Sequence, residues 1–446
     1  MNKKFIVGLM CLMNLIIYPC FAVDRNDLNV EFFNRFNDDF LSQYVNEAID
    51  NNHSAKQATI RVEEYRQGVK LQFANELPSF SVSANYLGIH SPKFNPNLSV
   101  SKNAFVLPFM ANYEADFLLK NRDKTKSVKK TYEMSKFDEQ SVYLALLSDV
   151  ATVYTNILEY DKLIEEQEKI VDNYNQILNE DNKKLARGVI NTTELNNSKA
   201  NIEQANITLE NLIKQREILL MQFAVLLGRG LGVNINDLNA NIQRGKLDDF
   251  EYNAIIPSEI ESDVIFSRPD VKRAEMALEK AKIDIRVARK EFLPTFNITG
   301  IWAFNNIAPG TFFSWESSLA ALLAGATQDI FTGGRKIANL KFKKAKYEEL
   351  FEQYRQADLV AVKEVNTSLC IIKHDTEIEN GVNEKLNLEA KNLDNANKML
   401  NRGVISKTQH INSENIYINK DMDLTRAKTR RLVNYYTLYK TVGGKL

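Results

Sequence analysis

The sequence contains few of the residues that interrupt helices or cross-link chains. Only nine of its 446 residues are proline, so long uninterrupted helices are permitted. It has three cysteines, and only Cys370 lies clearly beyond the first 22 residues, which excludes a disulfide framework for the rest of the chain. The formal net charge is +0, and this balance gives no support for nucleic-acid binding, which usually needs a basic face.

Motifs of catalysis and metal binding are also missing. The sequence has no Gly-x-Ser-x-Gly, His-Glu-x-x-His or Walker motif. Its four histidines are scattered, without an i, i+4 pair and without a neighbouring cysteine cluster. We therefore expect no enzymatic activity, no cofactor and no metal site.

Long hydrophobic runs are confined to the N-terminus. Two lysines precede an apolar run at residues 5–17, and small residues follow. This pattern predicts a secretory signal peptide over residues 1–22, cut after Ala22, and the run is too short for a convincing spanning helix. Lipid attachment at Cys20 is an alternative, although residues 17–19 match poorly the small side chains that such processing prefers.

Two pairs of segments alternate strictly between apolar and polar residues, as half-buried strands do. The first pair spans about residues 77–119 and the second about 293–331, and each pair follows a Leu-Pro dipeptide. The return strand at about 104–119 contains Pro108, which suggests a bulge or an edge position. Strands of 12–16 residues are long for a globular sheet and fit tilted membrane strands.

Between the strand pairs the period changes to that of helices. Residues 121–187 contain no proline or glycine and carry apolar residues at alternating steps of four and three, which is a heptad pattern. About 65 helical residues would span roughly 100 Å. A matching pattern runs from Ile202 to Leu226, so we expect the two helices to form a long hairpin. Residues 229–257 are rich in glycine and asparagine and suggest an irregular linker.

The tip of this hairpin occurs twice. Residues 187–190 read Arg-Gly-Val-Ile and return at residues 402–405, an offset of 215 residues, while Pro78 and Pro294 lie 216 residues apart. We therefore predict two structural repeats, residues 23–228 and 258–446, joined by a linker at 229–257.

At this point the residues resemble a known family, the TolC family of outer-membrane efflux proteins. The tips resemble that family's periplasmic hairpin turns, and the likeness covers essentially the whole chain after residue 22. Further motifs that carry it are Arg268-Pro269-Asp270-Val271, Phe292-Leu293-Pro294 and Ile330-Phe331-Thr332-Gly333-Gly334-Arg335.

The resemblance implies a mainly α-helical protein with membrane β-strands, located in the outer membrane of a Gram-negative bacterium and extending into the periplasm. A homotrimer would form a 12-stranded β-barrel continuous with a long periplasmic α-helical coiled-coil barrel. It would be the exit duct of a tripartite efflux or type I secretion system. Substrates would pass passively from an inner-membrane pump, of RND or ABC type, through a periplasmic adaptor protein.

The resemblance also assigns roles to residues by position. The tips would dock the adaptor through Arg187, Gly188, Val189, Arg402, Gly403 and Val404. The periplasmic aperture would be lined by Glu194, Asn197, Gln409 and Asn412. Some family members carry acidic residues at the last two positions, so this amide-rich aperture puts strong cation selectivity in doubt. For Glu194 a solvated helix face is an equally good interpretation.

A closed barrel also follows from the strand pattern without the family. Open strand edges leave backbone groups unpaired in lipid, four strands cannot close a barrel, and three copies can. The apolar face would meet lipid, and the other face would line a water-filled pore through Ser79, Ser81, Asn112, Glu114 and Asp116.

A different class of protein gives the main alternative, a periplasmic coiled-coil structural protein with an ordinary soluble sandwich. The two differ in the apolar strand face, which a sandwich buries and a barrel exposes to lipid. Within the channel class, the sequence does not separate drug, metal and protein substrates.

Overall fold

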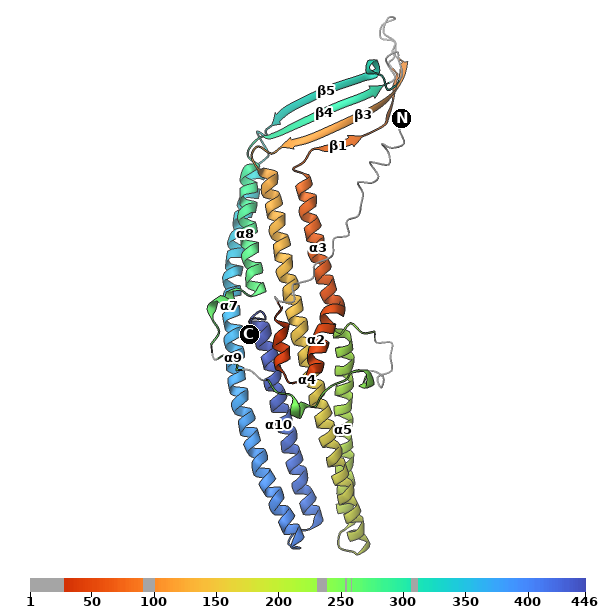
Figure 1. Ribbon diagram of the computed structural model, residues 1–446, viewed down its shortest axis with the longest axis vertical. Helices are drawn as coiled ribbons and strands as arrows, with labels where there is room; N and C mark the ends of the chain where they lie inside the picture. The colour runs from red at the N-terminus through yellow and green to blue at the C-terminus, as the bar shows by residue number, and fades with distance from the viewer. Residues whose placement is uncertain (1–27, 91–100, 231–238, 253–254, 258, 306–311) are drawn as a thin grey trace. The chain divides into compact units, whose positions relative to one another are not determined.

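The computed structural model describes residues 28–90, 101–230, 239–252, 255–257, 259–305 and 312–446 (Figure 1). The predicted signal peptide lies outside these residues. The chain forms two compact units, one of Met1–Ile60, Asp138–Pro269 and Asp358–Leu446, the other of Arg61–Phe137 and Asp270–Ala357. We call them unit 1 and unit 2. Each unit draws on both halves of the sequence, so the units do not coincide with the predicted repeats.

The helices of the two halves have equal lengths. In the first half, α3 (His53–Ala74), α4 (Lys120–Ala186) and α5 (Thr192–Leu226) have 22, 67 and 35 residues. In the second half, α8 (Pro269–Lys290), α9 (Arg335–Asn401) and α10 (Lys407–Thr441) have the same three lengths. Shorter elements are η2 (Val30–Arg35), α2 (Asp39–Asn51), η3 (Leu247–Asp249), α7 (Ser262–Phe266) and η4 (Trp315–Ser317).

Unit 2 contains an antiparallel sheet whose order is β1-β3-β4-β5, with β2 also paired to β3 (Figure 1). Its strands are β1 (Ser79–Val82), β2 (Asn85–His90), β3 (Ser101–Ala115), β4 (Thr295–Asn305) and β5 (Ser318–Thr327). Two strands end before the predicted residues, at 115 instead of 119 and at 327 instead of 331. At the first of these ends the chain turns, and Leu119 has a φ of 56°.

The prediction for Pro108 was wrong, because this residue lies in the central strand β3 and not at a bulge. It pairs with Ala303 of β4 on one side. On the other side, β1 and β2 share one register along β3, so no residue is inserted. Proline has no N–H to donate, and the ladder on that side is interrupted between β1 and β2 opposite this position. The proline carbonyl still accepts a hydrogen bond of 3.2 Å from the Ser83 N–H.

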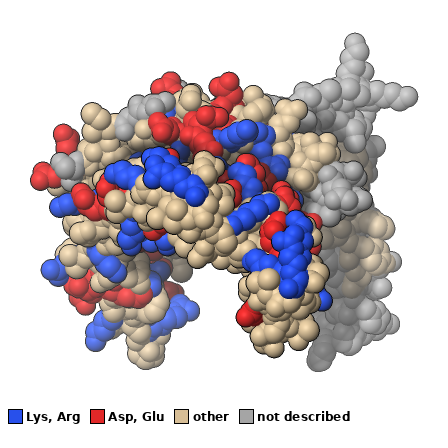
Figure 2. Space-filling model, turned by 90° about the horizontal axis from the view of Figure 1, so that it is seen from below, with Lys and Arg blue, Asp and Glu red and all other residues tan. Residues whose placement is uncertain are grey.

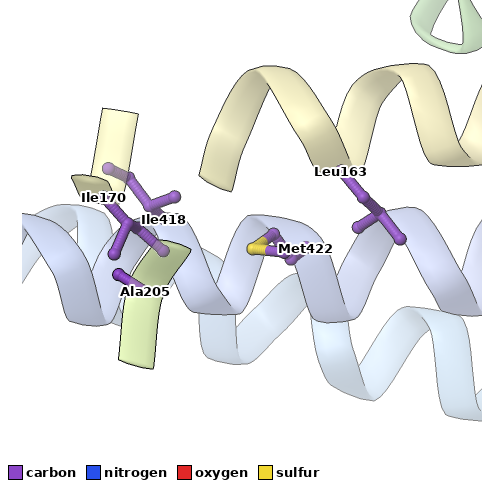
Figure 3. Packing of buried hydrophobic residues seen from close by; sticks show 5 residues of the cluster. All are labelled: Leu163, Ile170, Ala205, Ile418 and Met422. Carbon is purple, nitrogen blue, oxygen red and sulfur yellow. The ribbon is translucent and has the colours of Figure 1, made fainter. Parts of the chain in front are cut away.

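In unit 1, α4 packs against α5 and α10 at the same time. Figure 3 shows a buried cluster that draws on all three helices, formed by Leu163, Ile170, Ala205, Ile418 and Met422. The predicted heptad positions of α4 include buried residues such as Val150 and Ile157. A second buried stripe, which includes Leu147 and Tyr154, was not predicted. It exists because this helix has neighbours on two sides.

Buried polar contacts fix how these helices align. The Asn173 side-chain amide of α4 donates to the Asn415 side-chain carbonyl of α10 at 2.8 Å, and both residues are buried. On the other side, the Gln167 amide donates to the Ala205 carbonyl of α5 at 2.9 Å. A buried polar group without a partner is destabilising, so such pairs favour one alignment of the helices over shifted ones.

The segment predicted as an irregular linker packs closely within unit 1. Phe250 is fully buried and stacks on Phe36 with ring centroids 5.5 Å apart. The Arg229 guanidinium donates to both oxygens of Glu47, at 2.6 and 2.8 Å. Further along, Arg244 forms an ion pair with Asp161 of α4. These contacts hold the described parts of residues 229–257 against α2 and α4.

Among the described helices, α4 contains an 18-residue stretch that is long and apolar enough to cross a membrane by length and composition alone. However, 67% of that stretch is buried inside the chain. This burial is what a core helix shows.

Two glycines with matching backbone geometry offer a test of packing. Gly188 and Gly228 have φ of 72° and 71°, but a Cβ would meet open space at Gly188 and would lie 2.5 Å from the Asn51 carbonyl oxygen at Gly228. Alanine should destabilise by about 1–2 kcal/mol at either position through the left-handed backbone. Overpacking should add about 1–3 kcal/mol at Gly228 alone. Thermal unfolding followed by circular dichroism should show the lower midpoint for Gly228→Ala, and equal midpoints would contradict the packing.

Glu159 of α4 gives a pH-dependent test. Burial raises the pKa of its carboxyl from 4.5 to about 7, although the charge of Arg426 opposes the shift. The fold therefore favours the neutral acid, and stability is lost as pH rises from 4.5 through 7. Glu159→Gln should stabilise the protein by up to about 3 kcal/mol at pH 8 and leave it unchanged below pH 4.5. Glu203→Gln, at an exposed position of α5, is the control, and an equal effect of both changes would contradict the assignment.

Candidate functional site

Each long hairpin in unit 1 ends in the same tight turn. At the first tip, Gly188 has a φ of 72°, and its N–H donates to the Leu185 carbonyl at 2.9 Å. The next N–H, of Val189, donates to the Lys184 carbonyl at 2.9 Å. This is the Schellman arrangement, in which a left-handed residue lets two amides satisfy the last carbonyls of a helix.

The second tip repeats these bonds at the residues 215 positions later. Gly403 has a φ of 71°, and its N–H donates to the Leu400 carbonyl at 2.9 Å. The Val404 N–H donates to the Met399 carbonyl at 2.9 Å. The glycines are therefore needed for the left-handed backbone, since a Cβ would meet no other atom within 4 Å at either one.

The valines after the two glycines are exposed, at 68% for Val189 and 65% for Val404. In a Schellman turn this position often packs back onto its own helix, but these side chains point into solvent. The tips are also joined laterally, because the Lys184 ammonium donates to Thr408 of α10 at 3.0 Å and to Asp181 at 2.9 Å. Two exposed apolar side chains thus sit on turns held within one unit.

The four predicted aperture residues lie just after the tips, and all are exposed. Gln409 has a local role, because its side-chain oxygen accepts the Ser406 N–H at 2.8 Å while the Ser406 hydroxyl accepts the Gln409 N–H at 3.2 Å. This capping box starts α10. At the first tip the Asn191 side chain caps α5 by accepting the Glu194 N–H at 2.9 Å. No interaction is recorded for the Glu194 carboxylate among the described residues.

Four of the five predicted pore residues share one face of the sheet. Ser79 is in register with Asn112, whose side chain accepts a hydrogen bond of 3.1 Å from Thr299 of β4. Ser81 and Glu114 lie on the same face by register, and Glu114 forms an ion pair of 2.8 Å with Lys120.

Asp116 lies beyond the end of β3, because its carboxylate is used at the start of α4. Its two oxygens accept the N–H groups of Lys120 at 2.6 Å and Arg122 at 2.9 Å. A carboxylate at a helix N-terminus satisfies free amides and complements the helix dipole. Its alternation with Asn112 and Glu114 therefore did not indicate a strand position.

The opposite face of the sheet is apolar and exposed. It carries Phe80, Phe109, Trp302 and Leu322, all exposed, with the Phe109 and Trp302 rings 6.2 Å apart. Exposed apolar area of this extent on a sheet marks a surface for lipid or another protein.

Charge and metal-binding groups give no competing site in the described parts of the chain. No group of three or more His, Cys, Asp or Glu side chains there could hold a metal ion. Figure 2 shows acidic and basic side chains interspersed on the face seen from below, without a large area of one sign. The features that stand out are therefore the tips and the two-faced sheet.

Comparison with known proteins identifies the family. The model of the family described as outer membrane efflux protein matches residues 44–229 and 262–444. The chain belongs to this family. It is a family of transport channels and not of enzymes, and the outer-membrane location and efflux function predicted from the sequence are confirmed.

Several curated outer-membrane efflux proteins are similar over most of their length. The probable outer membrane lipoprotein SilC of Salmonella typhimurium is 23% identical over 92% of this chain and 87% of its own. The antibiotic efflux pump outer membrane protein ArpC of Pseudomonas putida is 22% identical over 92% of this chain and 84% of its own.

Solved efflux channels have the same fold. The CmeC outer membrane channel of Campylobacter jejuni superposes with a TM-score of 0.83 over 93% of this chain and 87% of its own, at 21% identity. The open state of the Neisseria gonorrhoeae MtrE channel gives 0.81 over 96% and 93%, also at 21% identity.

One feature of this efflux protein was missed in the sequence. On the face with Ser79 the sheet is polar near the helices, but farther along β3 it becomes apolar. There Met110, Ile301 and Ala321 lie side by side, and the next row is Pro108, Ala303 and Leu319. We call these two rows the apolar belt. The even-numbered residues of β3 carried the signal, but the rows are visible only once the register aligns the strands.

Proposed function

We propose that three copies of this outer-membrane efflux protein close one twelve-stranded barrel and one helical tube, which passively conducts substrates out of the cell. The observation that carries this is the sheet of unit 2, whose edge strands β1, β2 and β5 each pair with one neighbour in the described residues. In lipid an unpaired edge leaves N–H and C=O groups without partners. Closed rotational symmetry pairs every edge, and the exposed apolar face then meets lipid.

The internal duplication supports the same assembly. Equal helix lengths in both halves and two identical tip turns make each chain two similar staves of the tube. The pore would be lined by Ser79, Ser81, Asn112 and Glu114 near the helices and by the apolar belt farther out.

The energy for transport would come from an inner-membrane pump of RND or ABC type, reached through a periplasmic adaptor. The described residues contain no cluster that could bind a metal ion, and a passive duct needs none. The relatives include proteins named for cation efflux and for antibiotic efflux. Both kinds of substrate are therefore compatible with this fold, and the pump would select between them.

The tips would dock the adaptor. Val189 and Val404 supply exposed apolar surface, and Arg187 and Arg402, beside them, supply charge. Apolar side chains on rigid turns lose little conformational entropy when a partner covers them, which favours binding.

A double variant tests this docking. Val189→Glu with Val404→Glu should abolish export, because two charges would be buried against the adaptor. Trimer yield should not change, since both side chains are exposed in the chain. Susceptibility of the native host to exported compounds is the measurement. The control carries the same added charge at exposed sites of the same hairpins, Asn196→Glu with Asn395→Glu, and should export normally. Normal export by the valine variant would refute docking at the tips.

Conductance tests both the channel and its aperture. Purified protein should insert into planar bilayers as discrete channels with a weak cation preference, set by Glu194 as the one carboxylate among the four predicted aperture residues. Glu194→Gln should remove that preference, whereas Glu203→Gln should retain it. A preference that survives Glu194→Gln places this residue on a solvated face. A mature protein that stays monomeric and soluble without detergent would overturn the channel itself.

A further inference from the structure

The segment between β5 and α9 exposes two large apolar side chains almost completely. Ile330 is 98% exposed and Phe331 is 89% exposed. They are adjacent in sequence, and both lie outside the strand that was predicted to contain them. Single exposed apolar residues are common, but a neighbouring pair with this exposure indicates a surface that is covered in the assembled protein.

Hydrogen bonds hold this segment in a defined shape. Before the pair, the Gln328 side-chain amide donates to the Phe292 carbonyl at 2.8 Å. After it, Gly333 and Gly334 adopt φ of 60° and 82°, and the Arg335 N–H donates to the Thr332 carbonyl at 3.1 Å. The Lys336 ammonium lies 3.2 Å from the Asp329 carboxylate and so links the two sides of the turn. The apolar pair is thus presented on an ordered turn.

The sheet order determines what lies beside this turn when a second copy is added. β1 and β5 form opposite edges of the sheet in Figure 1. Every pairing in the sheet is antiparallel, so β5 runs antiparallel to β1. The last residue of β5, Thr327, and the first residue of β1, Ser79, therefore lie at the same end of the sheet. Pairing β5 of one copy with β1 of the next places the turn beside the residues that precede β1.

Those residues are also exposed and apolar. Leu71 and Phe73 at the end of α3, and Leu77 before β1, are all exposed. We call residues 71–77 the α3 end surface. The start of α9 continues the apolar character on the side of the turn, through the exposed Ile337 and Phe342. Both members of the contact thus exist in one chain, at the two edges that a closed barrel must join.

We infer that Ile330 and Phe331 of each copy pack against the α3 end surface of the next copy and lock the subunits together below the barrel. This inference rests on the proposed three-copy assembly and adds its intersubunit contact. The committed partner is a second copy of this chain. A lipid surface is the competing occupant, and the test below separates the two.

The test uses the full mature protein in detergent. Ile330→Asp with Phe331→Asp should lower the apparent association constant of the trimer by about tenfold or more for each side chain lost, as measured by the trimer fraction on dilution. The matched control is Ile255→Asp, at a side chain that is 95% exposed in unit 1, and it should leave the trimer unchanged. An equal loss in the control, or no loss in the double variant, counts against the contact.

Cross-linking decides the partner even where the charged variant fails to fold. In a Cys370→Ser background, Phe331→Cys with Leu77→Cys should give covalent dimers and trimers with a short bis-maleimide, and neither cysteine alone should do so. Trimers that form without this cross-link would overturn the inference and leave the channel proposal intact, with lipid as the occupant of the turn. A wild-type protein that stays monomeric would instead overturn the channel proposal.

Discussion

The constraint on which this protein depends is that a backbone amide in lipid has no water to bond. The sheet of unit 2 satisfies its inner ladders, but its two edges remain open within one chain. Closing those edges with further copies makes the assembly, and not the single chain, the folded unit in the membrane. The apolar face with Phe80, Phe109 and Trp302, which would be a liability in a soluble sandwich, becomes the surface that contacts lipid.

The helices solve a different problem, which is to remain aligned over a great length. Hydrophobic packing alone allows a long coiled coil to shift by whole turns, because its pattern repeats. Buried polar pairs, such as Asn173 with Asn415, remove that freedom, since a shifted alignment leaves their amides unpaired. In unit 1 the segment after α5 adds the ion pairs of Arg229 and Arg244, which hold it to α2 and α4.

Function in such a channel resides at surfaces that the single chain leaves uncovered. The tips carry exposed valines on turns whose backbone is fully bonded, and the turn after β5 carries Ile330 and Phe331 on an equally ordered backbone. In both places order and exposure occur together, so a partner can bind without first arranging the loop. Relatives named for cations and for antibiotics fit this view, because the duct can stay the same while the pump differs.

The sequence by itself determined the features that arise within a few residues: the period of each helix and strand, the glycines of the tips and the repetition of the plan. These follow from local sterics and hydrogen bonding, so neighbouring residues suffice to predict them. Tertiary structure decided the second buried stripe of α4, the apolar belt and the end of β3, where Asp116 caps a helix. The stripe and the belt depend on which distant segment lies alongside. For Asp116, strand alternation and helix capping both fit the sequence, and the folded backbone decided between them.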